Sequence, residues 1–196
     1  MNVAPLRRTL VFGGARSGKS AHAERLALAA AGTGEIVYVA TAVGRTDGEM
    51  QQRIEQHRAR RETLGGQWRT VQEPMALGRV VRENSRADNV VLVDCLTVWL
   101  SNLLFADGVE FPEMGPINAP AAFTLERVSL LRALQDAPGR VILVSSEVGM
   151  GIVPQGAVSR WFVDEAGRLN QSVAALCEQV QWVAAGLPLS LKGGPC

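Results

Sequence analysis

The chemistry of this chain centres on eight consecutive residues that read G-G-A-R-S-G-K-S and fit the phosphate-binding pattern G-x-x-x-x-G-K-[ST]. Glycines in such a loop let backbone N–H groups turn inward around a phosphate. Lys19 would reach the β- and γ-phosphates, and the Ser20 hydroxyl would bind Mg²⁺. The alternative is a glycine-rich turn that binds nothing. The pattern favours nucleotide binding by Gly13, Gly14, Ala15, Arg16, Ser17, Gly18, Lys19 and Ser20.

Asp94 is a candidate metal ligand outside the phosphate loop. It follows the continuous apolar run of residues 90–93, which is typical of a strand buried on both faces of a parallel sheet. An acid at the carboxyl end of such a strand lies beside the phosphate loop in this class of fold and holds Mg²⁺ directly or through water. The alternative is a helix-capping role, because a helical segment starts at Leu96.

The chain has only two histidines, His22 and His57. His22 comes just after the phosphate loop, and a structural role is favoured for it. His57 shares a helix face with Met50 and Ile54, so it could simply pack there. Arginines at positions 53, 58, 60 and 61 surround it, however, and arginine binds phosphate in a bidentate manner. Beside a triphosphate, His57 could therefore act as a nucleophile.

Strands and helices must alternate to position these groups. Strands are expected at 9–12, 35–40, 68–71, 89–95, 140–144 and 180–184, and helices at 21–30, from Thr46, and at 75–83, 96–100, 121–135 and 157–178. Thr46 and Glu49 form a capping-box pattern. Gly167 is expected to interrupt the last helix, and an irregular tail is expected from Gly186. Residues 106–120 predict a long loop. The alternation predicts one open, mostly parallel α/β domain spanning residues 1–196.

Composition excludes several classes of protein. A formal net charge of +1 gives no sign of a nucleic-acid or membrane-surface binder. No segment resembles a secretory signal or a membrane span. The three cysteines are odd in number and far apart, so they predict neither a disulfide framework nor a zinc site. A cytoplasmic protein with reduced thiols is expected.

Motifs along nearly the whole chain carry a resemblance to one family, the bifunctional adenosylcobinamide kinase / adenosylcobinamide-phosphate guanylyltransferases of cobalamin biosynthesis. The phosphate loop alone is generic, but the set in this order is specific. The matching segments are G-G-A-R-S-G-K-S at 13–20, Y-V-A-T-A at 38–42, D-G-E-M-x-x-R-I-x-x-H-R at 47–58, W-R-T-V-Q-E-P at 68–74, V-L-V-D-C-L-T-V-W-L-S-N-L-L at 91–104, E-V-G-M-G-I-V-P at 147–154, G-R-L-N-Q at 167–171 and A-G-L-P-L at 185–189.

The resemblance implies a RecA-like P-loop fold, homotrimers and two reactions on a corrinoid. ATP or GTP phosphorylates the aminopropanol hydroxyl of adenosylcobinamide. GTP then guanylylates the product through a GMP–histidine intermediate, which falls on His57. Besides the phosphate loop, the implied nucleotide contacts are Ala40, Thr41, Ala42, Arg58, Ala59, Arg60, Arg61, Gln72 and Asp94.

Two positions depart from the family pattern. Position 72 is Gln where members commonly have Glu, and position 146 is Ser where Asn is usual. Two other hypotheses remain beside the bifunctional enzyme: a simple P-loop kinase in which His57 only packs, and a nucleotide-dependent switch or assembly ATPase. The guanine-reading N-K-x-D sequence of regulatory GTPases is absent.

Overall fold

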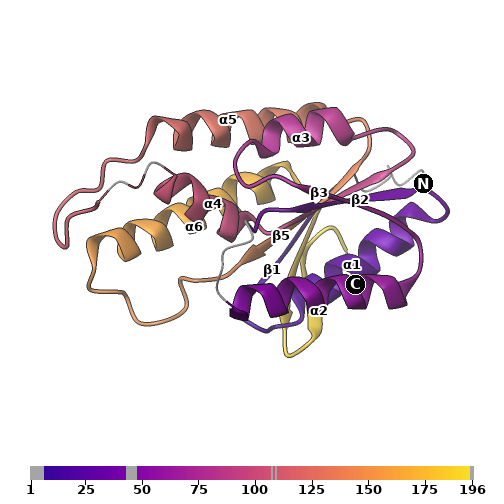
Figure 1. The fold of residues 1–196 in the computed structure, drawn as a ribbon, viewed down its shortest axis with the longest axis horizontal. Coiled ribbons are helices and arrows are strands. Elements are labelled where there is room, and N and C mark those ends of the chain that lie inside the picture. The colour runs from indigo at the N-terminus through magenta and orange to yellow at the C-terminus, as the bar shows by residue number, and fades with distance from the viewer. Residues whose placement is uncertain (1–6, 43–47, 107, 109, 195–196) are drawn as a thin grey trace.

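The computed structural model describes residues 7–42, 48–106, 108 and 110–194. The predicted alternation of strands and helices is confirmed (Figure 1). The strands are β1 (Arg8–Gly13), β2 (Glu35–Ala40), β3 (Gln67–Gln72), β4 (Val90–Asp94), β5 (Arg140–Ser146), β6 (Gln179–Ala184) and β7 (Leu187–Lys192). The helices are α1 (Lys19–Ala31), α2 (Gly48–Leu64), α3 (Leu77–Asn84), α4 (Leu96–Phe105), α5 (Ala121–Asp136) and α6 (Ala157–Leu176).

The seven strands form one sheet in the order β3-β2-β4-β5-β1-β6-β7. Every neighbouring pair is parallel except β6 and β7. Parallel strands bring their carboxyl ends to one edge, and the register aligns Ala40 with Asp94 and Gly13 with Ser146. The loops that follow β1, β2, β4 and β5 therefore meet at that edge.

Helices cover both faces of the sheet. In Figure 1, α1 and α2 lie below it, and α3, α4, α5 and α6 lie above it. Strand residues alternate between the two layers: Val91 and Val93 pack on the α3–α6 side, whereas Val90 and Leu92 pack on the α1 side. This double burial explains the continuous apolar run of β4, because both faces of the strand must be hydrophobic.

Two expectations about the C-terminal third are wrong. Gly167 does not interrupt α6, because Ala166, Leu169 and Val173 keep the helix packed on the core, and this burial outweighs the roughly 1 kcal/mol penalty of a helical glycine. The tail is not irregular either. Ala185 and Gly186 both have positive φ, as a tight hairpin turn requires, and β7 then pairs with β6.

The long loop predicted between α4 and α5 is confirmed over its described residues, 106, 108 and 110–120. No helix in the described part of the chain is long and apolar enough to cross a membrane. The expected cap at Thr46 lies outside the described residues, and α2 is described from Gly48.

Candidate active site

The phosphate loop joins β1 to α1 and is closely packed against the rest of the fold. A Cβ on Gly13 would lie 2.3 Å from the carbonyl oxygen of Val183, so only glycine fits there. Gly18 has φ +94° and ends the loop in the left-handed conformation that favours glycine. The glycines thus satisfy packing and backbone constraints, and α1 begins at the next residue with its N-terminus at the loop.

The β6–β7 hairpin supports this loop from one side. The Gly186 N–H donates to the Ser17 carbonyl at 2.8 Å. A Cβ on Gly18 would approach the Gly186 Cα to 3.1 Å. The hairpin, which the sequence analysis missed, therefore holds the phosphate loop in shape.

Two polar side chains of the loop suit an anion. Lys19 Nζ donates to the Gly14 carbonyl at 3.1 Å, so the ammonium curls over the loop. Ser17 Oγ is buried and has no hydrogen-bond partner among the described residues. A buried hydroxyl without a partner is costly, and a phosphate oxygen at this loop would satisfy it.

Asp94 ends β4, as predicted, but β4 is not the neighbour of β1. β5 lies between them, so Asp94 lies two strands, about 10 Å, from Gly13 along the edge. The residues directly beside Gly13 are those at the end of β5, and the Glu147 N–H donates to the Gly13 carbonyl at 3.0 Å. This spacing leaves room between loop and carboxylate for a metal-bound phosphate.

Tyr38 connects the end of β4 to the α1 face of the sheet. Its hydroxyl donates to Asp94 Oδ2 at 3.3 Å. Burial raises the pKa of Tyr38 well above its ordinary value, and the Asp94 charge raises it further. The phenol therefore stays protonated and remains a hydrogen-bond donor to the carboxylate.

Thr41 fixes the connection between the ends of β2 and β4. Its Oγ1 donates to the Cys95 carbonyl at 2.9 Å and accepts from the Cys95 N–H at 2.8 Å. Burial raises the pKa of Cys95 to about 11, Asp94 adds to the rise, and Lys19 partly opposes it.

A charged cluster joins α2 to α1. Glu24 of α1 is completely buried, and its carboxylate contacts Arg60 Nε at 2.5 Å and Arg61 Nη1 at 3.6 Å. The Arg61 guanidinium also stacks on the Tyr38 ring, 3.8 Å from its centroid. Burial alone would lower the pKa of Arg60, but the Glu24 carboxylate raises it overall. We call Glu24, Tyr38, Arg60 and Arg61 the α1–α2 clamp.

The predicted nucleophile lies on α2. The structure describes the backbone of His57 and Arg58 within this helix, and their side chains lie outside what it describes. Position 57 is one helical turn before Arg61, on the same face of α2. Position 57 lies near the middle of α2, whose first turn is at the carboxyl edge because the helix follows β2.

The remaining predicted contacts are spread along the carboxyl edge. Ala40 and Gln72 end adjacent strands in register, and Gln72 is exposed. Ala42 follows Thr41, and Ala59 is exposed on α2. The structure thus brings the strand-end residues to one edge with the phosphate loop, whereas the side chains of Arg60 and Arg61 are engaged by Glu24.

His22 occupies the structural position expected of it. The ring is buried, and Nε2 lies 2.6 Å from Gln181 Oε1 on β6. This contact ties α1 to the sheet behind the phosphate loop.

The donor set fits magnesium rather than a softer metal. Ser20 and Asp94 offer oxygen ligands, which Mg²⁺ prefers, and phosphate oxygens and water complete its shell in nucleotide sites. Within the described residues there is no cluster of three His, Cys, Asp or Glu side chains of the kind that zinc requires.

Comparison with known sequences decides the family. A family model described as cobinamide kinase / cobinamide phosphate guanyltransferase matches residues 9–191. The chain belongs to this family. The match covers nearly the whole chain, including the phosphate loop, Asp94 and position 57, so the resemblance noted from the motifs is confirmed.

Two relatives of this cobinamide kinase family member are similar along their full length. The bifunctional adenosylcobalamin biosynthesis protein CobP of Pseudomonas aeruginosa is 50% identical over 188 residues, which cover 96% of this chain and 99% of that protein. The bifunctional adenosylcobalamin biosynthesis protein CobU of Escherichia coli K12 is 40% identical over 185 residues, which cover 93% and 98%.

A solved structure agrees with the predicted P-loop, RecA-like class. An ATPase from the type III secretion system of pathogenic bacteria superposes with a TM-score of 0.50 at 14% identity, covering 94% of this chain and 56% of that chain. At this identity the likeness concerns the fold alone. With the mostly parallel seven-stranded sheet, it confirms the predicted fold class.

Sequence reasoning missed Glu24 and Tyr38 in this family member. Glu24 lies on the buried face of α1 together with Ala23 and Ala27. A single acid on an otherwise apolar helix face was the available signal, because a buried carboxylate requires a partner. Tyr38 lies in a buried strand, where nothing in the pattern distinguishes it from a core aromatic residue.

Proposed function

We propose that this protein carries out both reactions of its family on one corrinoid substrate. It phosphorylates the aminopropanol hydroxyl of adenosylcobinamide with ATP or GTP. It then transfers GMP from GTP to adenosylcobinamide phosphate, which gives adenosylcobinamide-GDP. The observation that carries this proposal is the family match over residues 9–191, supported by the intact phosphate loop.

The kinase step uses the phosphate loop. Backbone N–H groups of the loop and the start of α1 hold the triphosphate, and Lys19 neutralises charge on the transferred phosphoryl group. The substrate hydroxyl attacks the γ-phosphorus while the bond to the β-phosphate oxygen breaks, and the hydroxyl proton is released to solvent. Ser20 and Asp94 would hold Mg²⁺, which neutralises phosphate charge when bound.

Guanylyl transfer proceeds in two displacements at the α-phosphorus. An imidazole nitrogen of His57 forms a bond to this phosphorus, and pyrophosphate leaves with the electrons of the broken P–O bond. A phosphate oxygen of adenosylcobinamide phosphate then attacks the same phosphorus and regenerates the histidine. Splitting the transfer in this way replaces one difficult step by two easier ones.

The position of α2 supports His57 in this role. Both α1 and α2 run away from the carboxyl edge, since each follows a parallel strand. The α1–α2 clamp joins Glu24 to Arg60 and Arg61. Ser20 lies one helical turn before Glu24 on α1, and position 57 lies one helical turn before Arg61 on α2. This pairing supports the proposed role of His57, because the backbone of position 57 lies at the level of Ser20.

Several further properties follow from the family resemblance and belong to this proposal. The site uses Mg²⁺ with ATP and GTP as substrates, and the nucleotide contacts comprise the predicted residues along the loop, the strand ends and α2. The protein works as a cytoplasmic homotrimer of single-domain subunits. It needs no nucleic acid.

Product analysis tests the proposal. The purified protein is incubated with adenosylcobinamide, ATP and Mg²⁺, and then with GTP, and the corrinoids are separated by chromatography and mass spectrometry. We expect adenosylcobinamide phosphate first, and adenosylcobinamide-GDP with pyrophosphate second. Formation of adenosylcobinamide phosphate without adenosylcobinamide-GDP would show that the protein is a kinase only. Formation of neither product would contradict the proposal.

A further inference from the structure

A cavity of about 650 Å³ opens at the carboxyl edge of the sheet, on the face covered by α4 and α6. Four strand ends contribute to it: Ala42 after β2, Pro74 after β3, Cys95 after β4 and Ser146 at the end of β5. One side of α4 forms its wall through Thr97, Val98, Ser101, Asn102 and Phe105.

This cavity adjoins the phosphate loop. Ser146 is the register partner of Gly13, the first residue of the loop. Its N–H donates to Thr97 Oγ1 at 2.7 Å, which fixes the wall of the cavity to the strand beside the loop. Cys95 lies next to Asp94 in the chain, directly after the end of β4.

The residues beside the cavity indicate which phosphate of a bound nucleotide it would face. In phosphoryl transfer the lysine of the loop reaches the β- and γ-phosphates, and Asp94 would hold a metal that neutralises their charge. In the proposed function Asp94 therefore marks the γ-phosphate end of the site, and the cavity begins beside it at Cys95. The group that attacks the γ-phosphorus must approach from this end.

The described lining indicates the chemistry of the occupant. Hydroxyl and amide groups come from Thr97, Ser101, Asn102 and Ser146, and apolar surface comes from residues such as Met75 and Phe162. Among the described residues, none that lines the cavity carries a carboxylate, ammonium or guanidinium group. Such a surface suits a group with amide, hydroxyl and methyl parts.

We propose that this cavity receives the aminopropanol arm of the corrinoid acceptor and directs its hydroxyl at the γ-phosphate. The inference rests on the proposed function, because it concerns the acceptor of that kinase step. A cavity of this volume holds a drug-sized group, so the corrin ring stays outside its mouth. Ser101 and Val98, on the α4 wall, restrict the space available to the arm.

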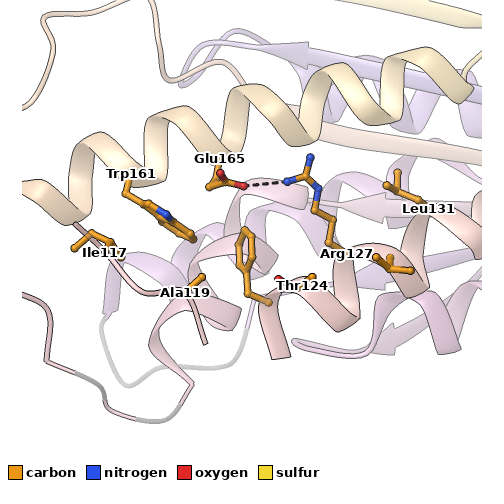
Figure 2. A pocket seen from close by; sticks show the side chains of 9 residues that line it. Ile117, Ala119, Thr124, Arg127, Leu131, Trp161 and Glu165 are labelled. Atoms are coloured by element: carbon orange, nitrogen blue, oxygen red, sulfur yellow. Dashed lines mark hydrogen bonds and ion pairs between the residues drawn. The ribbon is translucent and has the colours of Figure 1, made fainter. Parts of the chain in front are cut away.

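A second hollow, of about 360 Å³, provides the contrast and the control. It lies between α5 and α6 and is lined by Ile117, Thr124 and Trp161 among others. Figure 2 shows Arg127 of α5 pointing across it to Glu165 of α6, to which Nη1 donates at 2.9 Å. Unlike the acceptor cavity, this hollow has no strand end among the described residues that line it, so it does not open at the carboxyl edge.

Filling the two hollows with the same side chain tests the inference. We expect Ser101→Phe to raise the KM for adenosylcobinamide in the kinase reaction by about tenfold or more, because it occupies the space of the arm. The KM for ATP and the labelling of the protein by α-³²P-GTP without acceptor should stay within about twofold of the wild type, since neither involves the acceptor. Thr124→Phe should change none of these values.

Val98→Phe fills the same cavity from a different position and replaces Ser101→Phe if circular dichroism shows that Ser101→Phe does not fold. A rise in acceptor KM in either folded variant supports the inference. An unchanged acceptor KM in the folded variant, or a rise in the KM for ATP instead, would overturn it. A wild-type protein that does not phosphorylate adenosylcobinamide would overturn the proposed function as well, so the two failures are distinguishable.

Discussion

At the scale of single residues, the account depends on Lys19, Asp94 and His57. Lys19 curls over the phosphate loop, and Asp94 accepts a hydrogen bond from a phenol that burial keeps protonated. These contacts tie the two polar groups to the scaffold before a nucleotide arrives. Preorganised groups stabilise a transition state without reorganising during the reaction.

Lys19→Ala should abolish both activities and leave the fold intact. The lysine makes one hydrogen bond to the loop, whereas in the proposed function its charge-assisted contact with the β- and γ-phosphates would contribute roughly 3 kcal/mol to the transition state. Steady-state assays of each reaction, with circular dichroism as the folding control, measure the effect. Normal kinase turnover in the variant would contradict the placement of the nucleotide at residues 13–20.

Asp94→Asn should raise the Mg²⁺ concentration needed for half-maximal kinase activity. The substitution removes one anionic oxygen from the metal site, and Mg²⁺ prefers such ligands. A titration of activity with Mg²⁺ at saturating ATP measures the shift. Tyr38→Phe, which removes only the hydrogen bond at 3.3 Å, should shift the titration less than Asp94→Asn. An unchanged Mg²⁺ dependence of Asp94→Asn would contradict the metal role and leave this residue as a hydrogen-bond acceptor of Tyr38. The capping alternative is not supported, because Cys95 is the N-cap of α4 and no side chain among the described residues caps it.

At the scale of helices and strands, the apolar runs predicted the sheet because strands buried on both faces have no polar alternation. β1, β2, β4 and β5 were all found in this way. The hairpin to β7 was missed because Pro188 argues against a strand, although an edge strand tolerates proline. The insertion of β5 between β1 and β4 could not be predicted, since strand order is set by crossovers and leaves no local pattern.

The candidate site was predictable to a similar extent. Motif spacing found the phosphate loop and Asp94, because their chemistry is encoded in contiguous residues. The α1–α2 clamp was not found, because Glu24 and Arg60 are 36 positions apart in the chain. Only the packing of α2 against α1 brings their charges together.

Glu24→Gln should loosen α2 and destabilise the fold. Arg61 is buried and would lose its anionic partner, at a cost of about 1–3 kcal/mol. Urea unfolding followed by circular dichroism measures the change. Glu83→Gln is the matched control, because it removes an exposed ion pair with Arg79 that contributes less than about 0.5 kcal/mol. Equal effects of the two substitutions would contradict the clamp.

At the scale of the whole molecule, the sheet separates the two faces that the proposed function uses. The acceptor cavity lies on the face covered by α4 and α6, whereas α2, with His57, lies on the face covered by α1. The phosphate loop stands at the edge between them. In the proposed function, the γ-phosphorus is therefore approached from one face and the α-phosphorus from the other, so one phosphate loop would serve both transfers.

The assembly should be a trimer, as the family resemblance implies. Light scattering coupled to size-exclusion chromatography should give a mass three times the 21.0 kDa of one chain at assay concentrations. A mass of one chain with full activity would show that no partner subunit is needed.

The central claim is that His57 carries GMP between GTP and the corrinoid. The protein is incubated with α-³²P-GTP and Mg²⁺ without acceptor, and the label retained after denaturation is counted and tested for stability in acid and in alkali. The account predicts a label that is acid-labile and alkali-stable, as a phosphorus–nitrogen bond should be, and its loss in His57→Ala, which keeps some adenosylcobinamide phosphorylation. An acid-labile GMP adduct that persists in His57→Ala would contradict the account and leave His22 as the other histidine to test.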